Sequence, residues 1–224
     1  MCAVLPILAG GCLQLDGDLT IKADRSATLQ VNYTLGDQIL EQLRSAMDAA
    51  DLLAAASGEP VAPSAGSAMR TFGNPGEAEI RTYMRTLSPY GIECSEVRRT
   101  PRGSGRGIRM VVKIADLERA VKAPPLQAAG IVFRRNDDGS FELMRAATGA
   151  RTNLLAGAET VRDVTPVFAG FRTSFRIKTP GQIVRTSAQK HTTRWAVWEH
   201  DFNRNPASVQ DALSGEISVA YRND

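Results

Sequence analysis

The chain has 224 residues, of which 43% are hydrophobic, and a formal net charge of +3 at pH 7. This length accommodates one large or two small globular domains with an ordinary core. The small positive charge is compatible with an anionic surface but does not require nucleic acid as a partner. After the first dozen residues, no stretch is long and apolar enough to cross a bilayer as a helix.

An apolar run opens the chain and ends in Gly10, Gly11 and Cys12. It resembles the lipobox of bacterial lipoproteins, in which the run is cleaved off and the cysteine carries the lipid. Small residues before the cut are typical of such signals, but no Lys or Arg precedes Cys12, so we expect the true start codon to lie upstream. The alternative is that Cys12 is a small buried hydrophobe at the start of a cytosolic strand. We predict a signal peptide over residues 1–11, lipidation at Cys12 and one domain over residues 12–224.

Lipidation would place the domain in the bacterial cell envelope, outside the cytoplasm. A lipoprotein cysteine carries at least a diacylglyceryl group, and two acyl chains give stable anchoring where one does not. Leu13 follows the cysteine, which favours the outer membrane if the host has two membranes. With Cys12 acylated, the mature domain keeps only Cys94, so no intramolecular disulfide and no CxxC metal site is expected.

The first structural pattern begins directly after Cys12. Apolar and polar residues alternate over Leu13–Ile21 and again over Ala27–Leu35, with the turn-prone Ala23–Ser26 between them. Period-two alternation joined by a short polar link predicts a β-hairpin with one buried face. The hairpin would hold the domain close to the membrane.

The period then changes to that of a helix. Ile39, Leu43 and Met47 recur four residues apart, which predicts an amphipathic helix over residues 37–56. Residues 57–73 are rich in Ser, Gly, Pro and Ala and predict a loop. Asn74 as N-cap, followed by Pro75, predicts the start of a second helix that ends before Pro89.

The remaining elements are predominantly strands. Short runs predict strands at 92–99, 108–114, 131–135, 141–145, 171–178, 183–186, 192–201 and 216–221, a short helix over 116–122 that stops at Pro124-Pro125, and an ambiguous segment over 147–165. Strands joined mostly by hairpins, with helices inserted as a block, indicate an α+β fold. We predict an antiparallel β-sheet with two main helices packed on one face, an arrangement that could enclose an apolar cavity.

Both ends of the chain resemble the LppM-type bacterial lipoproteins. The start, Gly11-Cys12 followed by Leu13–Ile21, looks like the mature start of that family, and Gly170-Phe171 through Thr179-Pro180-Gly181 to Trp195 resembles its late sheet. The resemblance covers about a third of the chain. It implies an envelope domain with a sheet-and-helix fold that could hold a lipid, and it transfers no catalytic residue.

The sequence carries no catalytic signature, so we expect neither an enzyme nor a cofactor. His191 and His200 lack metal-site spacing and are interpreted as strand residues. Cys94 could be a nucleophile, but a single cysteine beside an apolar strand position is more often simply buried. Asp16 and Asp18 share one strand face and are best explained as part of its solvated side.

Five arginines, Arg98, Arg99, Arg102, Arg106 and Arg109, flank a Gly-rich connection between two predicted strands. Because Arg suits bidentate phosphate contacts, one interpretation is a clamp for lipid headgroup phosphate or another anionic envelope polymer. The alternative is a soluble hairpin tip, since charge runs usually just solvate a loop. Aromatic interleaving is absent there, and we expect no nucleic-acid partner.

Aromatic residues gather late in the chain: Phe168, Phe171, Phe175, Trp195, Trp198 and Phe202. They could line an apolar ligand pocket or fill a core, and sequence alone does not separate the two. Two functions therefore stay open. The first is a membrane-anchored, non-catalytic lipoprotein that binds lipid or another amphipathic envelope component. The second is a lipid-anchored structural or assembly protein that binds another envelope protein and no small ligand.

Overall fold

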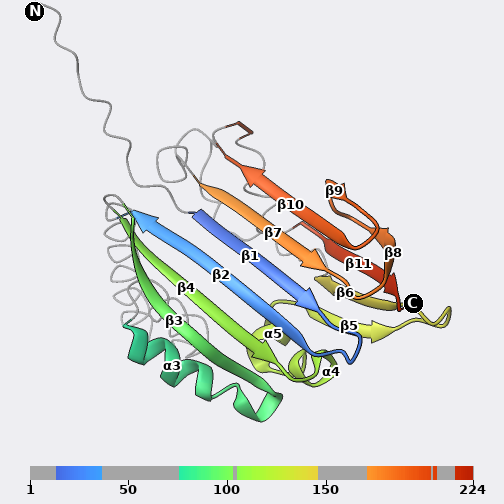
Figure 1. Ribbon diagram of the computed structural model, residues 1–224, viewed down its shortest axis with the longest axis horizontal. Helices are drawn as coiled ribbons and strands as arrows, with labels where there is room; N and C mark the ends of the chain where they lie inside the picture. Colours follow the sequence, from blue (N-terminus) through green and yellow to red (C-terminus); the bar gives the residue numbers. More distant parts are fainter. Residues whose placement is uncertain are drawn as a thin grey trace, which may run out of the picture.

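The computed structural model describes residues 14–36, 76–102, 105–145, 171–202, 204–205 and 215–223. Strands dominate these ranges (Figure 1). The proposed signal peptide with Cys12, the predicted helix over 37–56, the loop over 57–73 and the segment over 147–165 lie outside the described residues.

A seven-stranded sheet forms the larger layer. Its order is β3-β4-β2-β1-β7-β10-β9. The strands are β1 Gln14–Ile21, β2 Ala27–Gly36, β3 Ile92–Arg102, β4 Gly105–Ile114, β7 Arg172–Lys178, β9 Lys190–His191 and β10 Trp195–Asp201. All neighbours are antiparallel except β1 and β7, which run parallel with Gln14 opposite Arg172. The predicted first hairpin is confirmed and lies in the middle of this sheet.

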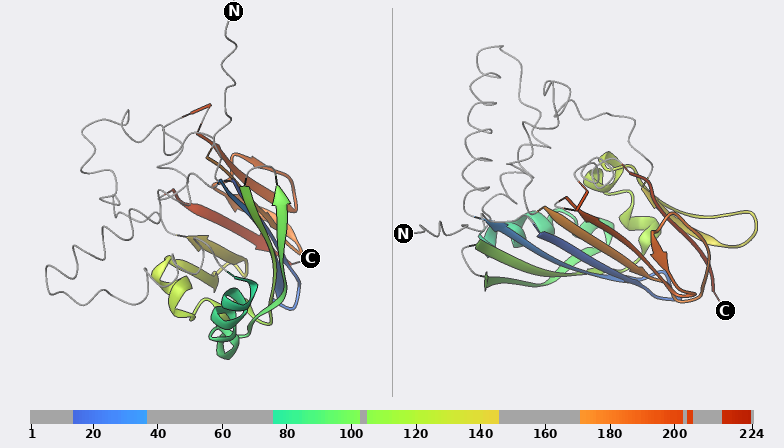
Figure 2. Two further views of the ribbon diagram at one scale, coloured as in Figure 1. Left: turned by 90° about the vertical axis from the view of Figure 1, so that its left-hand side faces the viewer. Right: turned by 90° about the horizontal axis from the view of Figure 1, so that it is seen from above.

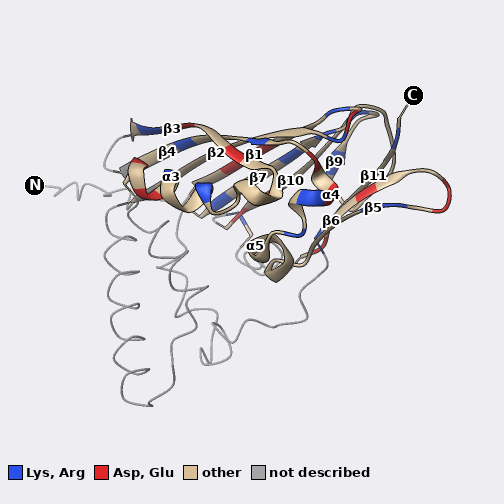
Figure 3. Cartoon of the chain, turned by 90° about the horizontal axis from the view of Figure 1, so that it is seen from below, with Lys and Arg blue, Asp and Glu red and all other residues tan. Residues whose placement is uncertain are grey.

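A second sheet of four strands has the order β5-β6-β11-β8 and is antiparallel throughout. The strands are β5 Ile131–Arg135, β6 Phe141–Arg145, β8 Gln182–Thr186 and β11 Ile217–Arg222. The small sheet and the helices lie on the same face of the large sheet (Figures 2 and 3). The prediction of a single sheet was therefore wrong, because periodicity shows that a strand has a buried face but not which sheet it joins.

The described helices are short. They are α3 Glu77–Arg85, α4 Leu117–Ala120 and α5 Pro124–Ala128, with a 3₁₀ turn at Ser88–Tyr90. Of the two predicted main helices only the second falls within the described residues, so the fold there is a sheet-dominated α+β fold. The N-cap of α3 is Gly76, whose N–H donates to a carboxylate oxygen of Glu79 at 2.9 Å, so the prediction of Asn74 as N-cap was wrong.

Helix α5 was missed by the sequence analysis. Pro124-Pro125 ends the predicted helix over 116–122, and in the structure the same two prolines begin a new helix. Proline is tolerated in the first turn because the N–H groups there have no partner within the helix. The predicted N-terminus of α4 is confirmed, since the Asp116 carboxylate accepts the N–H of Glu118 at 2.7 Å.

The core lies between the two sheets. Its most deeply buried side chains come from both layers and from α3: Ile80, Ile177, Val219 and Tyr221 are each 0% exposed. On β1, the buried Leu19 and Ile21 face the core, while Asp16 and Asp18 lie on the other face of the strand. The alternation of β1 and β7 thus decides which side chains enter the space between the layers.

Candidate ligand cavity

The two sheets together with α4 and α5 line a cavity of about 320 Å³. This volume lies at the lower end of the roughly 300–1,000 Å³ usual for small-ligand sites. The apolar lining residues from the large sheet are Leu15, Leu19, Leu29, Ile114, Phe175, Ile177 and Trp198. Those from the helices and the small sheet are Leu117, Ala120, Val121, Leu126, Ile131, Leu143, Met144 and Ile217. The other lining residues are Arg145, Thr173 and His200.

One wall depends on a glycine. Gly17 lies on β1 opposite Phe175 of β7, and a Cβ at Gly17 would come 2.6 Å from Cδ2 of that ring. The Phe175 ring therefore lies over Gly17, where no other residue would leave room for it. Its centroid is 6.3 Å from that of Trp198, with the planes tilted by 38°. These two aromatic side chains form part of the cavity wall as a unit.

The cavity is buried at one end and exposed at the other. Ile177 is 0% exposed and Leu117 is 3% exposed, whereas Leu15, near the start of β1, is 41% exposed. Thr173 and His200 are cross-strand neighbours in the same row of the sheet as Leu15. The polar lining of the large sheet therefore lies at the exposed end, which we call the mouth.

Arg145 supplies the cationic group of the lining. It ends β6, where it pairs with Ile131 and Ile217, and its Nη2 donates to the carbonyl oxygen of Gly215 at 2.7 Å. Burial lowers the pKa of the Arg145 guanidinium, which nevertheless stays charged at neutral pH. Arg145 is not among the site residues predicted from the sequence. The sequence did contain a signal for it. Phe141, Leu143 and Arg145 alternate along β6, and the first two belong to the core or pack against it, so the Arg145 side chain is expected on the same face.

The late aromatic residues divide between the two roles predicted for them. Phe175 and Trp198 line the cavity, whereas Phe171 and Phe202 are buried without being among its described lining residues. Trp195 is 37% exposed. Phe168 lies outside the described residues. The aromatic cluster is therefore part cavity wall and part filled core.

Of the five arginines, the three whose side chains are described do not converge on one point. Arg98 and Arg109 are exposed and directly opposite each other in β3 and β4. Arg99 pairs with the buried Ile108, and its backbone N–H donates to the Glu77 carboxylate at 3.0 Å, so it belongs to the other face of the hairpin. In the backbone register, Arg102 pairs with Gly105, and Arg106 pairs with Pro101 and Leu35.

The remaining candidate residues are spread over the fold. His191 is exposed on β9, and His200 lines the cavity. Asp18 is 3.5 Å from Arg176 across the outer face of the large sheet. Within the described ranges, no group of three or more His, Cys, Asp or Glu side chains could hold a metal ion. None of the described helices is long and apolar enough to span a membrane.

Cys94 lies where the pairing register of β3 with β4 shifts, between Cys94 and Glu96. It lines a second cavity of about 370 Å³ together with Arg81 and Glu93. Its thiol donates to the carbonyl oxygen of Glu96 at 3.3 Å. Burial raises the pKa of the Cys94 thiol, although Arg81 and the hydrogen bond oppose this. Nucleophilic cysteines have a lowered pKa, so this environment favours the structural role.

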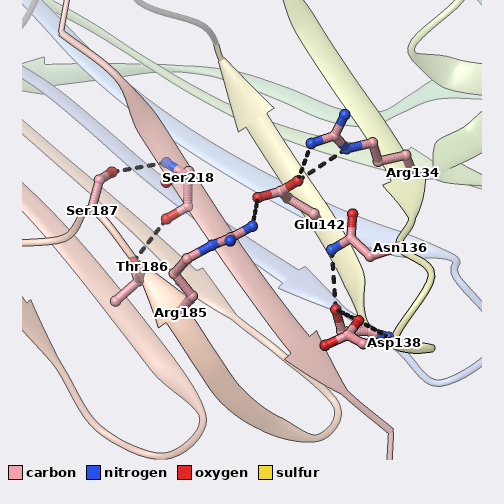
Figure 4. Close-up of polar contacts among 9 residues, drawn as sticks. Arg134, Asn136, Asp138, Glu142, Arg185, Thr186, Ser187 and Ser218 are labelled. Atoms are coloured by element: carbon pink, nitrogen blue, oxygen red, sulfur yellow. Dashed lines mark hydrogen bonds and ion pairs between the residues drawn. The ribbon is translucent and has the colours of Figure 1, made fainter.

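A polar network covers the outer face of the small sheet (Figure 4). The Glu142 carboxylate accepts from Arg134 at 2.7 and 3.0 Å and from Arg185 at 2.6 Å, which joins β5, β6 and β8. Beside it, the Ser187 hydroxyl oxygen accepts the backbone N–H of Ser218 at 2.9 Å. These contacts lie between strands and define no ligand position.

Taken together, fold and site define a two-sheet α+β domain with an apolar cavity between its layers. No family model matches the chain, and no curated protein matches it. Among solved structures, it is similar to the folded domain of the LppM protein of Mycobacterium tuberculosis, determined by NMR. The TM-score is 0.44 at 11% sequence identity, over 96% of this chain and 92% of that one. This similarity assigns neither a function nor site residues to the chain.

Proposed function

We propose that this chain is a lipid-anchored protein of the bacterial envelope whose non-catalytic domain holds an acyl chain in the cavity between its sheets. The observation that carries the proposal is the cavity itself, which is lined almost entirely by aliphatic and aromatic side chains. Its mouth lies near Leu15, three residues after Cys12. A lipid held by the domain would therefore enter from the end at which the proposed anchor is attached.

The size of the cavity favours one acyl chain over two. At roughly 30 Å³ for a group the size of a water molecule, about 320 Å³ accommodates about ten methylene groups. Burying ten methylenes contributes about 8 kcal/mol, which alone corresponds to a Kd of about 1 μM. Lost translational and rotational freedom weakens this further, so the tail alone cannot give tight binding.

The polar residues of the lining would supply what the tail does not. Thr173 and His200 lie at the mouth, and Arg145 brings a half-buried positive charge to the lining. An amphipathic ligand would place its chain among the apolar residues and its polar group at the mouth beside Thr173 and His200. Hydrogen bonds from charged donors are stronger than neutral ones, so Arg145 favours a ligand with an acceptor-rich headgroup.

Native mass spectrometry of the purified full chain tests lipid binding. We expect a co-purifying lipid in the parent protein and its loss in Leu126→Trp, which fills the cavity from α5. Val132→Trp is the matched control, because Val132 is 41% exposed and not among the described lining residues. A domain that stays empty under gentle purification would overturn lipid binding and support the assembly-protein alternative.

The anchor is tested separately. Expressed from its own gene in a bacterial host, the chain should partition into membranes and carry an acyl mass on Cys12, and Cys12→Ser should lose both. An unmodified Cys12 in the parent would refute the envelope assignment, whatever the cavity holds.

A further inference from the structure

The end of the large sheet at which β1 begins also carries the arginine-rich hairpin. Gln14 of β1 pairs with Thr34 of β2, and Thr34 pairs with Gly107 of β4. The last pair of the β3–β4 hairpin, Arg102 with Gly105, lies just beyond this row. Figure 1 shows the start of β1, the end of β3 and the start of β4 at the same end of the sheet. We call this region the arginine end and define it by Arg98, Arg99, Arg102, Arg106 and Arg109.

The arginine end and Cys12 can reach one surface. Neighbouring strands are about 4.8 Å apart, so β1 is about 10 Å from β4 and about 14 Å from β3. Cys12 precedes Gln14 by two residues, which span at most about 7 Å. A lipid on Cys12 therefore enters its membrane close to the arginine end.

The charges of Arg98 and Arg109 are incompletely balanced. Arg98 forms an ion pair with Glu96 at 3.1 Å, yet its side chain is 74% exposed. Arg109, its direct cross-strand neighbour, is exposed and has no ion pair with another described residue. Like charges directly opposite each other in a sheet are destabilising, and an external anion would relieve this.

The distribution over both faces argues for an extended anionic partner. Arg98 and Arg99 are consecutive strand residues, so their side chains lie on opposite faces of the hairpin. A compact ligand would need these side chains to converge, whereas a plane of headgroups that meets the hairpin end-on would not. Elsewhere on the strands, basic and acidic residues are interspersed (Figure 3).

We infer that the arginine end binds the anionic phospholipid headgroups of the same membrane that holds the lipid on Cys12. This inference rests on the proposed function for the anchor. An acyl anchor combined with a basic patch is a recognised means of stable attachment. Contact at this end turns the cavity mouth toward the membrane, so that a lipid passes between bilayer and cavity over a short path.

The full chain with Cys12→Ser isolates this contact from the anchor. We expect it to bind vesicles containing phosphatidylglycerol but not vesicles of phosphatidylcholine alone, and to release them as salt rises. Arg102→Gln, Arg106→Gln and Arg109→Gln combined should weaken vesicle binding on the order of 100-fold, at about fivefold per arginine. The matched control combines Lys22→Gln, Lys113→Gln and Lys178→Gln, which remove the same charge from exposed positions at the opposite end of the sheet.

Each basic residue near the membrane surface contributes about 1 kcal/mol, or about fivefold in affinity. Because the three lysines lie away from that surface, the control variant should bind within about fivefold of the Cys12→Ser chain. Equal losses in both variants would overturn the inference, because net charge alone would then explain the attraction. Failure of the Cys12→Ser chain to bind phosphatidylglycerol vesicles would overturn it too, as would stronger binding to a soluble anionic polymer than to vesicles. Lipid occupancy and acylation of Cys12 do not involve these arginines, so failure of the proposed function remains distinguishable.

Discussion

Replacing Glu142 by glutamine should lower the stability of the domain by about 2 kcal/mol. The carboxylate is 5% exposed and accepts hydrogen bonds from Arg134 and Arg185, whose side chains are 56% and 66% exposed. Breaking a fully buried ion pair costs about 3–5 kcal/mol, and an exposed pair contributes about 0–1 kcal/mol. With one buried and two half-exposed partners, an intermediate value is expected.

The same geometry predicts an asymmetry among the three residues. Arg134→Gln or Arg185→Gln should cost about 1 kcal/mol or less, because each leaves Glu142 one arginine and water reaches both guanidinium groups. Urea unfolding gives the free energies, and Glu142→Gln should lower Tm by about 4–8 °C for a domain of this size. A Glu142→Gln variant within 0.5 kcal/mol of the parent, as an order-of-magnitude threshold, or less destabilised than either arginine variant, would refute the reasoning.

The pH dependence gives an independent check on Glu142. Burial alone would raise the pKa of this carboxyl, but the hydrogen bonds from Arg134 and Arg185 outweigh burial and hold the pKa below its ordinary value of 4.5. The contribution to stability is therefore present above about pH 4.5 and is lost as the pH falls through the folded-state pKa. The stability curves of the parent and Glu142→Gln should converge in acid, and parallel curves would contradict this assignment.

Three further predictions follow from single contacts. Gly17→Ala should cost about 1–3 kcal/mol in urea unfolding, because it displaces the Phe175 ring, and should reduce lipid occupancy in native mass spectra. Tyr33→Phe should raise Tm, since the buried Tyr33 hydroxyl has no hydrogen-bond partner among the described residues; a lower Tm would mean that it has one. Hydrogen bonds from Ser140 lower the pKa of Asp138 to about 2, so Asp138→Asn should destabilise at neutral pH, with the difference vanishing between about pH 4 and pH 2.

Local pattern predicted the strands well, because alternation is set by the residues of each strand. The hairpin of β1 and β2, the strands β5 and β6, and the N-cap of α4 all follow from short-range signals. The parallel pairing of β1 with β7 does not, since it joins segments separated by most of the chain. Nothing in the alternation of either strand specifies its neighbour.

The cavity marks a second limit of sequence reasoning. Phe171 and Phe175 both belong to the alternation predicted over residues 171–178, yet Phe171, just before β7, is buried outside the described cavity lining, and Phe175 forms part of the cavity wall. The difference arises from Gly17 on the neighbouring strand, which makes room for the Phe175 ring. Arg145 was not predicted to line the cavity, because a charged residue at the end of a strand is expected to be solvent-exposed unless the position of the opposing sheet is known.

The parallel pairing of β1 with β7 has a consequence for how the domain forms. Asp18 and Arg176 are neighbours in the finished sheet although 158 residues separate them along the chain. Contacts between residues so far apart in the sequence slow folding, because the entropy of closing the intervening loop is lost before the strand pairing stabilises the fold. The edge of β1 that faces β7 thus waits for the last third of the polypeptide to emerge, and until then its backbone N–H and C=O groups have no partner strand.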